Sequence, residues 1–220
     1  MIDIIFEDSD ILVCVKPAGY LSEGSGEPSR SLPLTIERER GISSLFAVHR
    51  LDREVSGVMV YAKNKAAAAS LSAQVADRSF EKEYLAVIEG VPKDDEATLT
   101  DLLFKDSKRN KSFVVDRKRA GVKEASLSYK TLAKGDGRAL VRVRLHTGRT
   151  HQIRVQFGSR GMAVLGDGKY GSSVRSSEIA LVSCFIRFKH PRTNKTVEFT
   201  YEPTAEAFRT VFQIKNVPQA

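Results

Sequence analysis

Asp52 is a candidate for a chemically active carboxylate, because it stands between two arginines. It lies in the stretch His49–Gly57, HRLDREVSG. The apolar run 58–61 follows directly, so a turn closed by Gly57 leads into a strand. An aspartate in a turn commonly bonds its own backbone amides, which is a purely structural use. The functional alternative is a catalytic carboxylate that nearby guanidinium groups keep ionised. The stretch by itself favours the structural interpretation, so other segments must decide.

A second segment, 145–157, changes from an alternating strand to a helix at Gly148. The opening turns of that helix carry Arg149, His151 and Arg154. An arginine there can offer two parallel hydrogen bonds to a carboxylate or a phosphate. The alternative is a solvated basic helix face, which such runs usually form.

A third segment, 81–90, predicts a strand that contains Tyr84. On a strand Tyr84 shares one face with Ala86 and Ile88, so it points toward the core. Taken singly, a half-buried tyrosine is usually a packing residue with one satisfied hydroxyl group.

The elements that must position these residues follow from hydrophobic periodicity and turn signals. We predict an α+β fold in which a largely antiparallel, mixed β-sheet is flanked by a few helices. The predicted helices cover residues 32–40, 64–78, 149–158 and 204–212. The predicted strands cover residues 2–6, 11–15, 57–62, 80–89, 97–104, 123–133, 138–146, 179–188 and 196–201.

Basic residues outnumber acidic ones, 35 Lys and Arg against 27 Asp and Glu, which gives a formal net charge of +8. Such a balance favours a polyanionic partner, usually nucleic acid, although a merely soluble basic surface is the alternative. Eight of the cations crowd the stretch 105–123, which we interpret as a basic loop or edge hairpin able to follow a phosphate backbone.

The location of the protein is predicted from what the sequence lacks and from its cysteines. We find no basic leader followed by a long apolar region and no apolar run long enough for a membrane span. Cys14 and Cys184 sit in apolar runs without metal-ligand spacing, as buried small hydrophobic residues do. We therefore expect a cytoplasmic protein with no membrane partner.

Several ordered blocks of the chain together form a recognisable pattern. They are Lys16–Gly19 (KPAG), His49–Asp52 with Ser56–Gly57 and Ala62–Lys63, Lys82–Ala86 with Gly90, Thr147–Val155, and Leu165–Asp167 with Tyr170–Gly171. With these blocks in this order, the sequence resembles the RluA-type pseudouridine synthases. The resemblance covers nearly the whole chain. The resemblance implies a single catalytic domain over 1–220, the fold of that family, and isomerisation of specific uridines to pseudouridine in structured ribosomal or transfer RNA, with no cofactor and no metal.

The resemblance also implies roles for individual residues. Asp52 would be the essential aspartate, Tyr84 would stack on the flipped uracil and serve as the base for carbon 5, and Arg154 would pair with Asp52. Arg50 would fill the space that the flipped nucleotide leaves. We further expect RNA contacts from Arg149, His151, Ile153, Lys108, Arg109, Lys118 and Arg119, in a monomeric protein.

The sequence departs from the family pattern at a few positions. Val55 stands where threonine is usual, Gln156 where histidine is common, and 20–24 differs from the usual apolar continuation. One alternative is therefore a catalytically silent RNA-binding protein of the same fold.

A second alternative is a metal-dependent phosphodiesterase. Its ligands would be His49, Asp52, His146 and His151, a donor set of acceptable chemistry. Against it, His49 has the simpler interpretation of supporting the turn, and His151 that of forming the strand-to-helix junction.

Overall fold

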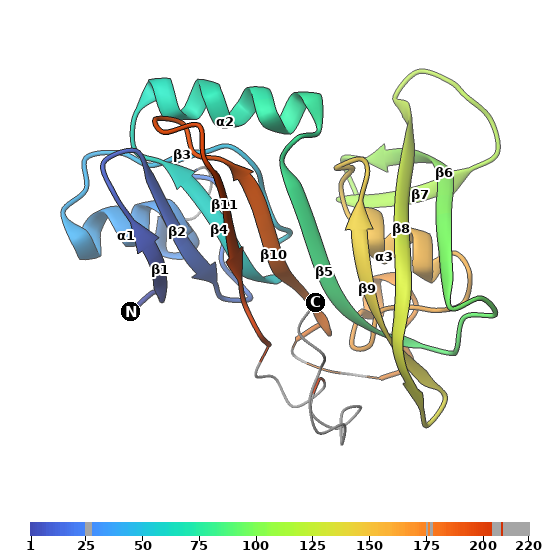
Figure 1. Cartoon of the computed structure of the whole chain (residues 1–220). Coiled ribbons are helices and arrows are strands. Elements are labelled where there is room, and N and C mark those ends of the chain that lie inside the picture. Colours follow the sequence, from blue (N-terminus) through green and yellow to red (C-terminus); the bar gives the residue numbers. More distant parts are fainter. Residues whose placement is uncertain (25–27, 175, 177, 204–207, 209–220) are drawn as a thin grey trace. The chain divides into compact units, whose positions relative to one another are not determined.

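The structure, a computed structural model, describes residues 1–24, 28–174, 176, 178–203 and 208. The chain divides into two units (Figure 1). Unit 1 comprises Met1–Glu83 and Val182–Glu202, and the main part of unit 2 is Tyr84–Leu181. That both units form the single catalytic domain implied by the resemblance stays a prediction.

Unit 1 is built around strands in the order β1-β2-β4-β10, with β3 beside β4 and β11 beside β10. Strands β4 and β10 run parallel, and the other pairs of this unit are antiparallel. The strands are β1 (Ile4–Glu7), β2 (Ile11–Lys16), β3 (Phe46–Ala47), β4 (Ser56–Ala62), β10 (Leu181–Lys189) and β11 (Thr196–Thr200). The helical elements are η1 (Pro28–Arg30), α1 (Leu32–Arg40) and α2 (Lys65–Asp77).

Helix α2 covers one face of these strands. Asn64 caps it, since the side-chain oxygen accepts a hydrogen bond from the amide of Ala67 at 2.9 Å. Ala67 and Leu71 are buried in one cluster with side chains of β2, β4 and β10. The amphipathic spacing that predicts this helix is thus the spacing that buries it.

Unit 2 contains strands in the order β5-β9-β8-β6-β7, with β7 at the end of the row. Its helix α3 packs against the strands, where the rings of Phe157 and Tyr129 lie 5.4 Å apart and Val155 joins a cluster with Leu103 and Ala125. The strands are β5 (Glu81–Glu89), β6 (Glu96–Asp106), β7 (Lys111–Val115), β8 (Val122–Gly135) and β9 (Arg138–Leu145). The helical elements are α3 (Gln152–Gly158) and η2 (Gly168–Tyr170).

The α+β fold class with a mixed, mainly antiparallel sheet is confirmed. The helix predicted over 149–158 begins only at Gln152, because His151 before it adopts a left-handed backbone with φ 53°. The basic stretch 105–123 does form a hairpin with β7 as its second strand. The helix predicted over 204–212 lies outside the described residues except for 208. No helix in the described part of the chain is long and apolar enough to cross a membrane.

Candidate active site

The turn that carries Asp52 enters strand β4. The amide of Val55 donates to the carbonyl oxygen of Asp52 at 3.0 Å and closes the turn. The Val55 side chain is buried, so the position where the family usually has threonine is here filled by apolar packing. Gly57 has φ 120°, and a Cβ there would lie 2.2 Å from the carbonyl oxygen of Ser183 on the neighbouring β10. Only glycine fits this close parallel approach.

Ser22 fixes the residue just before Asp52. Its hydroxyl group donates to the carbonyl oxygen of Leu51 at 2.8 Å and accepts from the amide of Leu51 at 3.0 Å. The Ser22 carbonyl oxygen in turn accepts from the hydroxyl group of Tyr61 on β4 at 2.9 Å. Ser22 is buried, so these bonds are shielded from water and hold the turn to the strand behind it.

Lys16 fixes the residue just after Asp52. Its ammonium group is fully buried and donates to the carbonyl oxygens of Pro17, Tyr20 and Arg53, at 3.0, 2.7 and 3.1 Å. Burial lowers the pKa of Lys16 to about 8, although the negative charges of Asp52 and Glu54 act in the opposite direction. The lysine of the KPAG block is therefore a buried cation that spans the loop after β2 and the Asp52 turn.

His49 supports the turn from inside the unit. Its Nε2 atom accepts a hydrogen bond from the amide of Val60 at 3.2 Å, and its ring lies 5.2 Å from that of Phe80. Burial, and secondarily the charge of Lys82, holds the pKa of His49 well below its ordinary value, so the ring is neutral. This is the supporting role expected for His49 and leaves its Nε2 atom engaged by the backbone.

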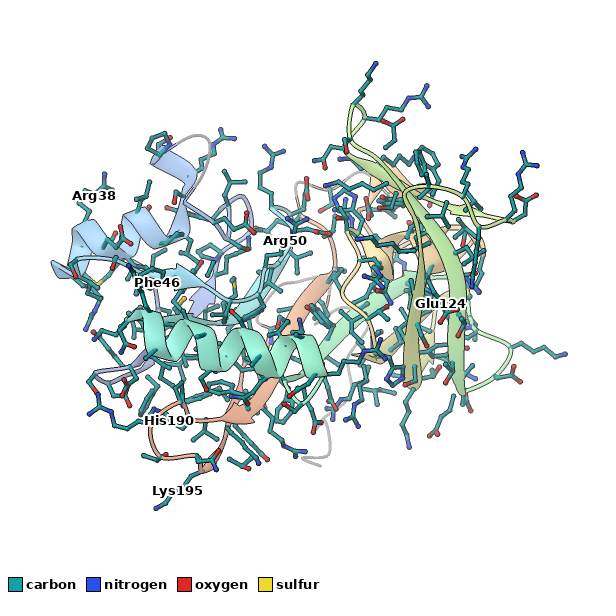
Figure 2. All side chains as sticks on the ribbon, turned by 90° about the horizontal axis from the view of Figure 1, so that it is seen from above. Arg38, Phe46, Arg50, Glu124, His190 and Lys195 are labelled. Carbon is teal, nitrogen blue, oxygen red and sulfur yellow. The ribbon has the colours of Figure 1, made fainter. Side chains whose placement is uncertain are left out.

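Arg50 on the same turn is exposed, and its side chain is labelled in Figure 2. It forms a salt bridge with Glu23 at 3.8 Å, in which about half of each side chain is exposed. Such a pair is screened by water and contributes little to stability. The expected role of Arg50 toward a flipped nucleotide stays a prediction.

Arg154 in unit 2 is held by a carboxylate to which the sequence analysis gave no role. Its Nε and Nη2 atoms donate to Oδ2 and Oδ1 of Asp167 at 2.6 and 2.9 Å, and the two side chains are 2% and 1% exposed. This fork fixes the plane of the guanidinium group. The expected pairing of Arg154 with Asp52, which belongs to unit 1, stays a prediction.

Tyr170 joins several parts of the same region. Its hydroxyl group accepts from the amide of Ser112 at 2.9 Å and lies 2.8 Å from Nδ1 of His151. The Arg154 guanidinium carbon is 5.3 Å from the centre of its ring. His151 is thus a buried residue of the strand-to-helix junction, as its simpler interpretation expects. Its contact with RNA stays a prediction.

The other predicted site residues of unit 2 lie on β5, on α3 and on the short segment before α3. Tyr84 on β5 and Ile153 on α3 are buried. Arg149 donates through Nε to the backbone carbonyl of Glu124 at 2.9 Å, which ties it to strand β8. Gln156 donates to the carboxylate of Asp101 on β6 at 2.7 Å, so the glutamine at the position of the usual histidine ties α3 to the sheet.

The predicted RNA-contacting residues Lys108, Arg109, Lys118 and Arg119 are all exposed. They lie on the two connections at either end of β7, two cations on each. Arg109 is paired with Asp106 at 3.7 Å, and Arg119 lies over the ring of Phe104.

The histidines of the metal-site alternative already have protein partners. His49 accepts from Val60, His151 is bonded to Tyr170, and Nε2 of His146 lies 2.6 Å from the hydroxyl group of Ser128. Each of these bonds engages one of the two nitrogens of its ring, which fits a structural role for these histidines.

A different cluster, Asp8, Asp10 and His190, has suitable spacing for a metal among the described residues (His190 is labelled in Figure 2). Arg192 already binds Asp10 through two bonds at 2.6 and 3.1 Å. Asn64 also donates to Asp10, at 2.9 Å. The cluster is therefore explained as a connection between the β1–β2 and β10–β11 turns.

Sequence reasoning missed Asp167 and Ser22 as supports of the site. Asp167 lies in the Leu165–Asp167 block, but nothing in its spacing indicates Arg154 as its partner. Ser22 opens a polar, glycine-rich stretch that reads as an ordinary loop. Burial of a small polar side chain against the Asp52 turn could not be read from composition.

Comparisons with known proteins indicate the family of the chain. A sequence profile described as RNA pseudouridylate synthase matches residues 10–159. An uncharacterised RNA pseudouridine synthase of Aquifex aeolicus is 36% identical over 96% of this chain and 72% of its own length. Ribosomal large subunit pseudouridine synthase D of Zymomonas mobilis is 32% identical over 91% of this chain and 69% of its own length.

A solved structure shows the same fold. Human RNA pseudouridylate synthase domain containing 1 superposes with a TM-score of 0.76 at 24% identity, covering 92% of this chain and 84% of the human chain. The profile and the relatives show that this chain belongs to the RNA pseudouridylate synthase family and is an RNA pseudouridine synthase.

Proposed function

We propose that this enzyme isomerises specific uridines of structured ribosomal or transfer RNA with Asp52 as its essential carboxylate. The observation that supports this most is the anchoring of the Asp52 turn. Ser22 holds the backbone of Leu51, and Lys16 holds the carbonyl group of Arg53. A carboxylate on a turn that buried groups fix on both sides is positioned before the substrate arrives, which lowers the barrier to reaction.

The proposed chemistry needs no redox step. The bond between ribose C1′ and uracil N1 breaks, the base turns, and C1′ bonds to C5. C5 then loses its proton and N1 takes one up, so the product is an isomer of the substrate. Asp52 would act as a nucleophile or remove a ribose proton, and both roles need an ionised carboxylate. Tyr84 would stack on the extruded uracil and take the C5 proton, and Arg154 would orient Asp52. The reaction uses no cofactor and no metal.

Ribosomal RNA is the first substrate to test. The Zymomonas mobilis relative is named as a ribosomal large subunit pseudouridine synthase, whereas the name of the Aquifex aeolicus relative gives no particular RNA. Transfer RNA is the second candidate. The exposed cations Lys108, Arg109, Lys118 and Arg119 support either choice because they can bind any phosphate backbone. We further propose that the enzyme acts as a cytoplasmic monomer.

The test is release of tritium from RNA that carries uridine labelled at C5, followed by mapping of the pseudouridine formed. Asp52→Asn should lower the rate by at least about a hundredfold, the lower range for a lost acid–base group, while RNA binding is retained. Glu54→Gln, which removes the same charge from the same turn, should keep normal activity.

Two outcomes would contradict the proposal. Activity that survives Asp52→Asn would rule out the assigned mechanism. RNA binding by the wild-type protein without release from any ribosomal or transfer RNA would instead favour the catalytically silent alternative.

A further inference from the structure

Two phenylalanines stand side by side on the hairpin that carries the basic cluster. Phe104 on β6 and Phe113 on β7 are directly opposed in the strand register, so they share one face of the sheet. Leu103, which precedes Phe104 on β6, is buried in one cluster with Val155 of α3. Because side chains alternate along a strand, Phe104 and Phe113 lie on the face that points away from α3.

Both rings are partly exposed, and each has a cation over it. The guanidinium carbon of Arg119 lies 5.0 Å from the ring centre of Phe104, and the ammonium group of Lys111 lies 5.5 Å from that of Phe113. A Cβ at Gly121 would come 3.4 Å from the Phe104 ring, so the backbone of the β7–β8 loop runs against that ring. Arg119 is thus held over an aromatic surface while it remains exposed.

The charge around these rings indicates what they bind. The stretch 105–123 carries eight cations and only two carboxylates, Asp106 and Asp116. A partly exposed aromatic pair in so basic a setting suits a polyanion that also has flat apolar faces, and RNA with unpaired bases has both. An acidic protein would satisfy the charges but would leave the ring faces without stacking partners.

We propose that Phe104, Phe113, Lys111 and Arg119, here called the stacking face, bind unpaired bases of the RNA substrate. This inference rests on the proposed function and extends it, because it assigns the enzyme a preference for single-stranded nucleotides beside its target. Bases stack on the Phe113 ring and on the guanidinium plane that Phe104 supports. The cations on the connections at the two ends of β7 bind the phosphates of the same RNA strand.

The test compares binding of two fluorescent RNAs, an unstructured oligouridine and a duplex of equal length, by anisotropy. Phe113→Leu and Phe104→Leu keep apolar volume but remove the flat ring. Each should weaken oligouridine binding about tenfold, within the range measured for lost base–aromatic stacking, and change duplex binding by less than about twofold. The salt dependence of binding should stay unchanged, because no charge is removed.

Three controls separate stacking from folding. Phe113→Tyr retains a ring and should restore binding of oligouridine. Phe6→Leu alters an exposed phenylalanine of unit 1 and should leave both RNAs unaffected. Thermal unfolding of each variant checks that the hairpin is intact.

Equal losses on duplex and oligouridine, or no loss on either, would overturn the stacking face. The tritium-release assay distinguishes this failure from failure of the proposed function. Tritium release by the wild-type enzyme, with normal oligouridine binding by Phe113→Leu, would refute only the stacking face. Selective loss of oligouridine binding in Phe113→Leu, together with no tritium release by the wild-type protein, would refute only the proposed function.

Discussion

Asp167 is the residue that adds most to the description of the site, because its carboxylate accepts two hydrogen bonds from the guanidinium group of Arg154. Arg154 is expected to orient Asp52, and a guanidinium group can do so only if its own plane is fixed. Asp167 supplies that constraint through two bonds in a nearly water-free setting. Asp167 is therefore a positioning residue in our interpretation, acting through Arg154.

Replacement Asp167→Asn should lower kcat by roughly tenfold to a hundredfold with a smaller change in KM, since the misplaced group acts in the reaction more than in binding. It should also lower the free energy of unfolding by about 3–5 kcal/mol, because a buried guanidinium group loses its counter-charge. Single-turnover kinetics and urea unfolding measure the two effects.

A matched control exists on the same unit. Arg160 and Asp101 also form a two-bond pair, at 2.9 and 3.1 Å, but it is partly exposed. Asp101→Asn should leave kcat normal, whereas Asp167→Glu should restore part of it by keeping the charge. An Asp167→Asn enzyme with normal kcat would mean that Arg154 is oriented by other contacts.

At the residue scale the sequence indicates candidate site residues but not how each side chain is held. Asp52 and Tyr84 are recognisable because they stand in short blocks whose order and spacing resemble a family. The partners of such residues come from segments with no local signal, as Asp167 and Ser22 show. Hydrogen bonds to backbone groups, such as those of Lys16, depend on where loops return in space and leave no periodic pattern in the sequence.

At the scale of elements, the turn that carries Asp52 depends on a lysine whose charge is costly to bury. Lys16 has its pKa lowered from 10.5 to about 8. Below about pH 8 the folded and the unfolded chain both hold the proton, so the cost of burial is complete. Between about pH 8 and 10.5 the unfolded chain still holds the proton that the folded chain has released. Stability from this group therefore rises with pH across that window.

The free energy of unfolding should rise by at most about 3 kcal/mol across that window. This follows from the difference between a pKa of 10.5 and one of about 8, at 1.36 kcal/mol per pKa unit. In Lys16→Met that pH dependence should be absent, so the stability of the wild type relative to the variant should increase between pH 8 and 10.5. Urea unfolding at intervals of pH measures it, with Lys195→Met as the exposed control. Equal pH dependence in wild type and Lys16→Met would show that the buried amine does not titrate in this window.

Most elements could be predicted because their signals are local. Asn64 followed by alanines specifies α2, and alternation of valines with arginines specifies β9. The start of α3 could not be predicted, because His151 has a left-handed backbone conformation. Its buried side chain is bonded to Tyr170, a partner that lies outside the local sequence. The two-residue strand β3 is too short to have a pattern and exists through its pairing with β4.

At the scale of the whole molecule, net charge predicts RNA binding only if the cations are grouped. The structure groups Lys108, Arg109, Lys118 and Arg119 on the connections flanking β7. Each phosphate that a cation neutralises releases a counterion, so the logarithm of affinity falls with the logarithm of salt by about 0.7–0.9 per contact. Charge and stacking therefore differ in their response to salt even on the same hairpin.

Reversal of these four charges to glutamate should weaken RNA binding at low salt and reduce the magnitude of the salt slope by up to about three. Phe113→Leu should leave that slope unchanged, which separates phosphate contacts from base stacking. Reversal of Arg38, Lys65, Lys93 and Lys195, which are also exposed but lie outside the hairpin, provides the matched control for net charge. Anisotropy titrations over a series of salt concentrations give all the slopes. If both sets of reversals reduce the slope equally, binding follows the total charge of the protein and the hairpin has no special part in it.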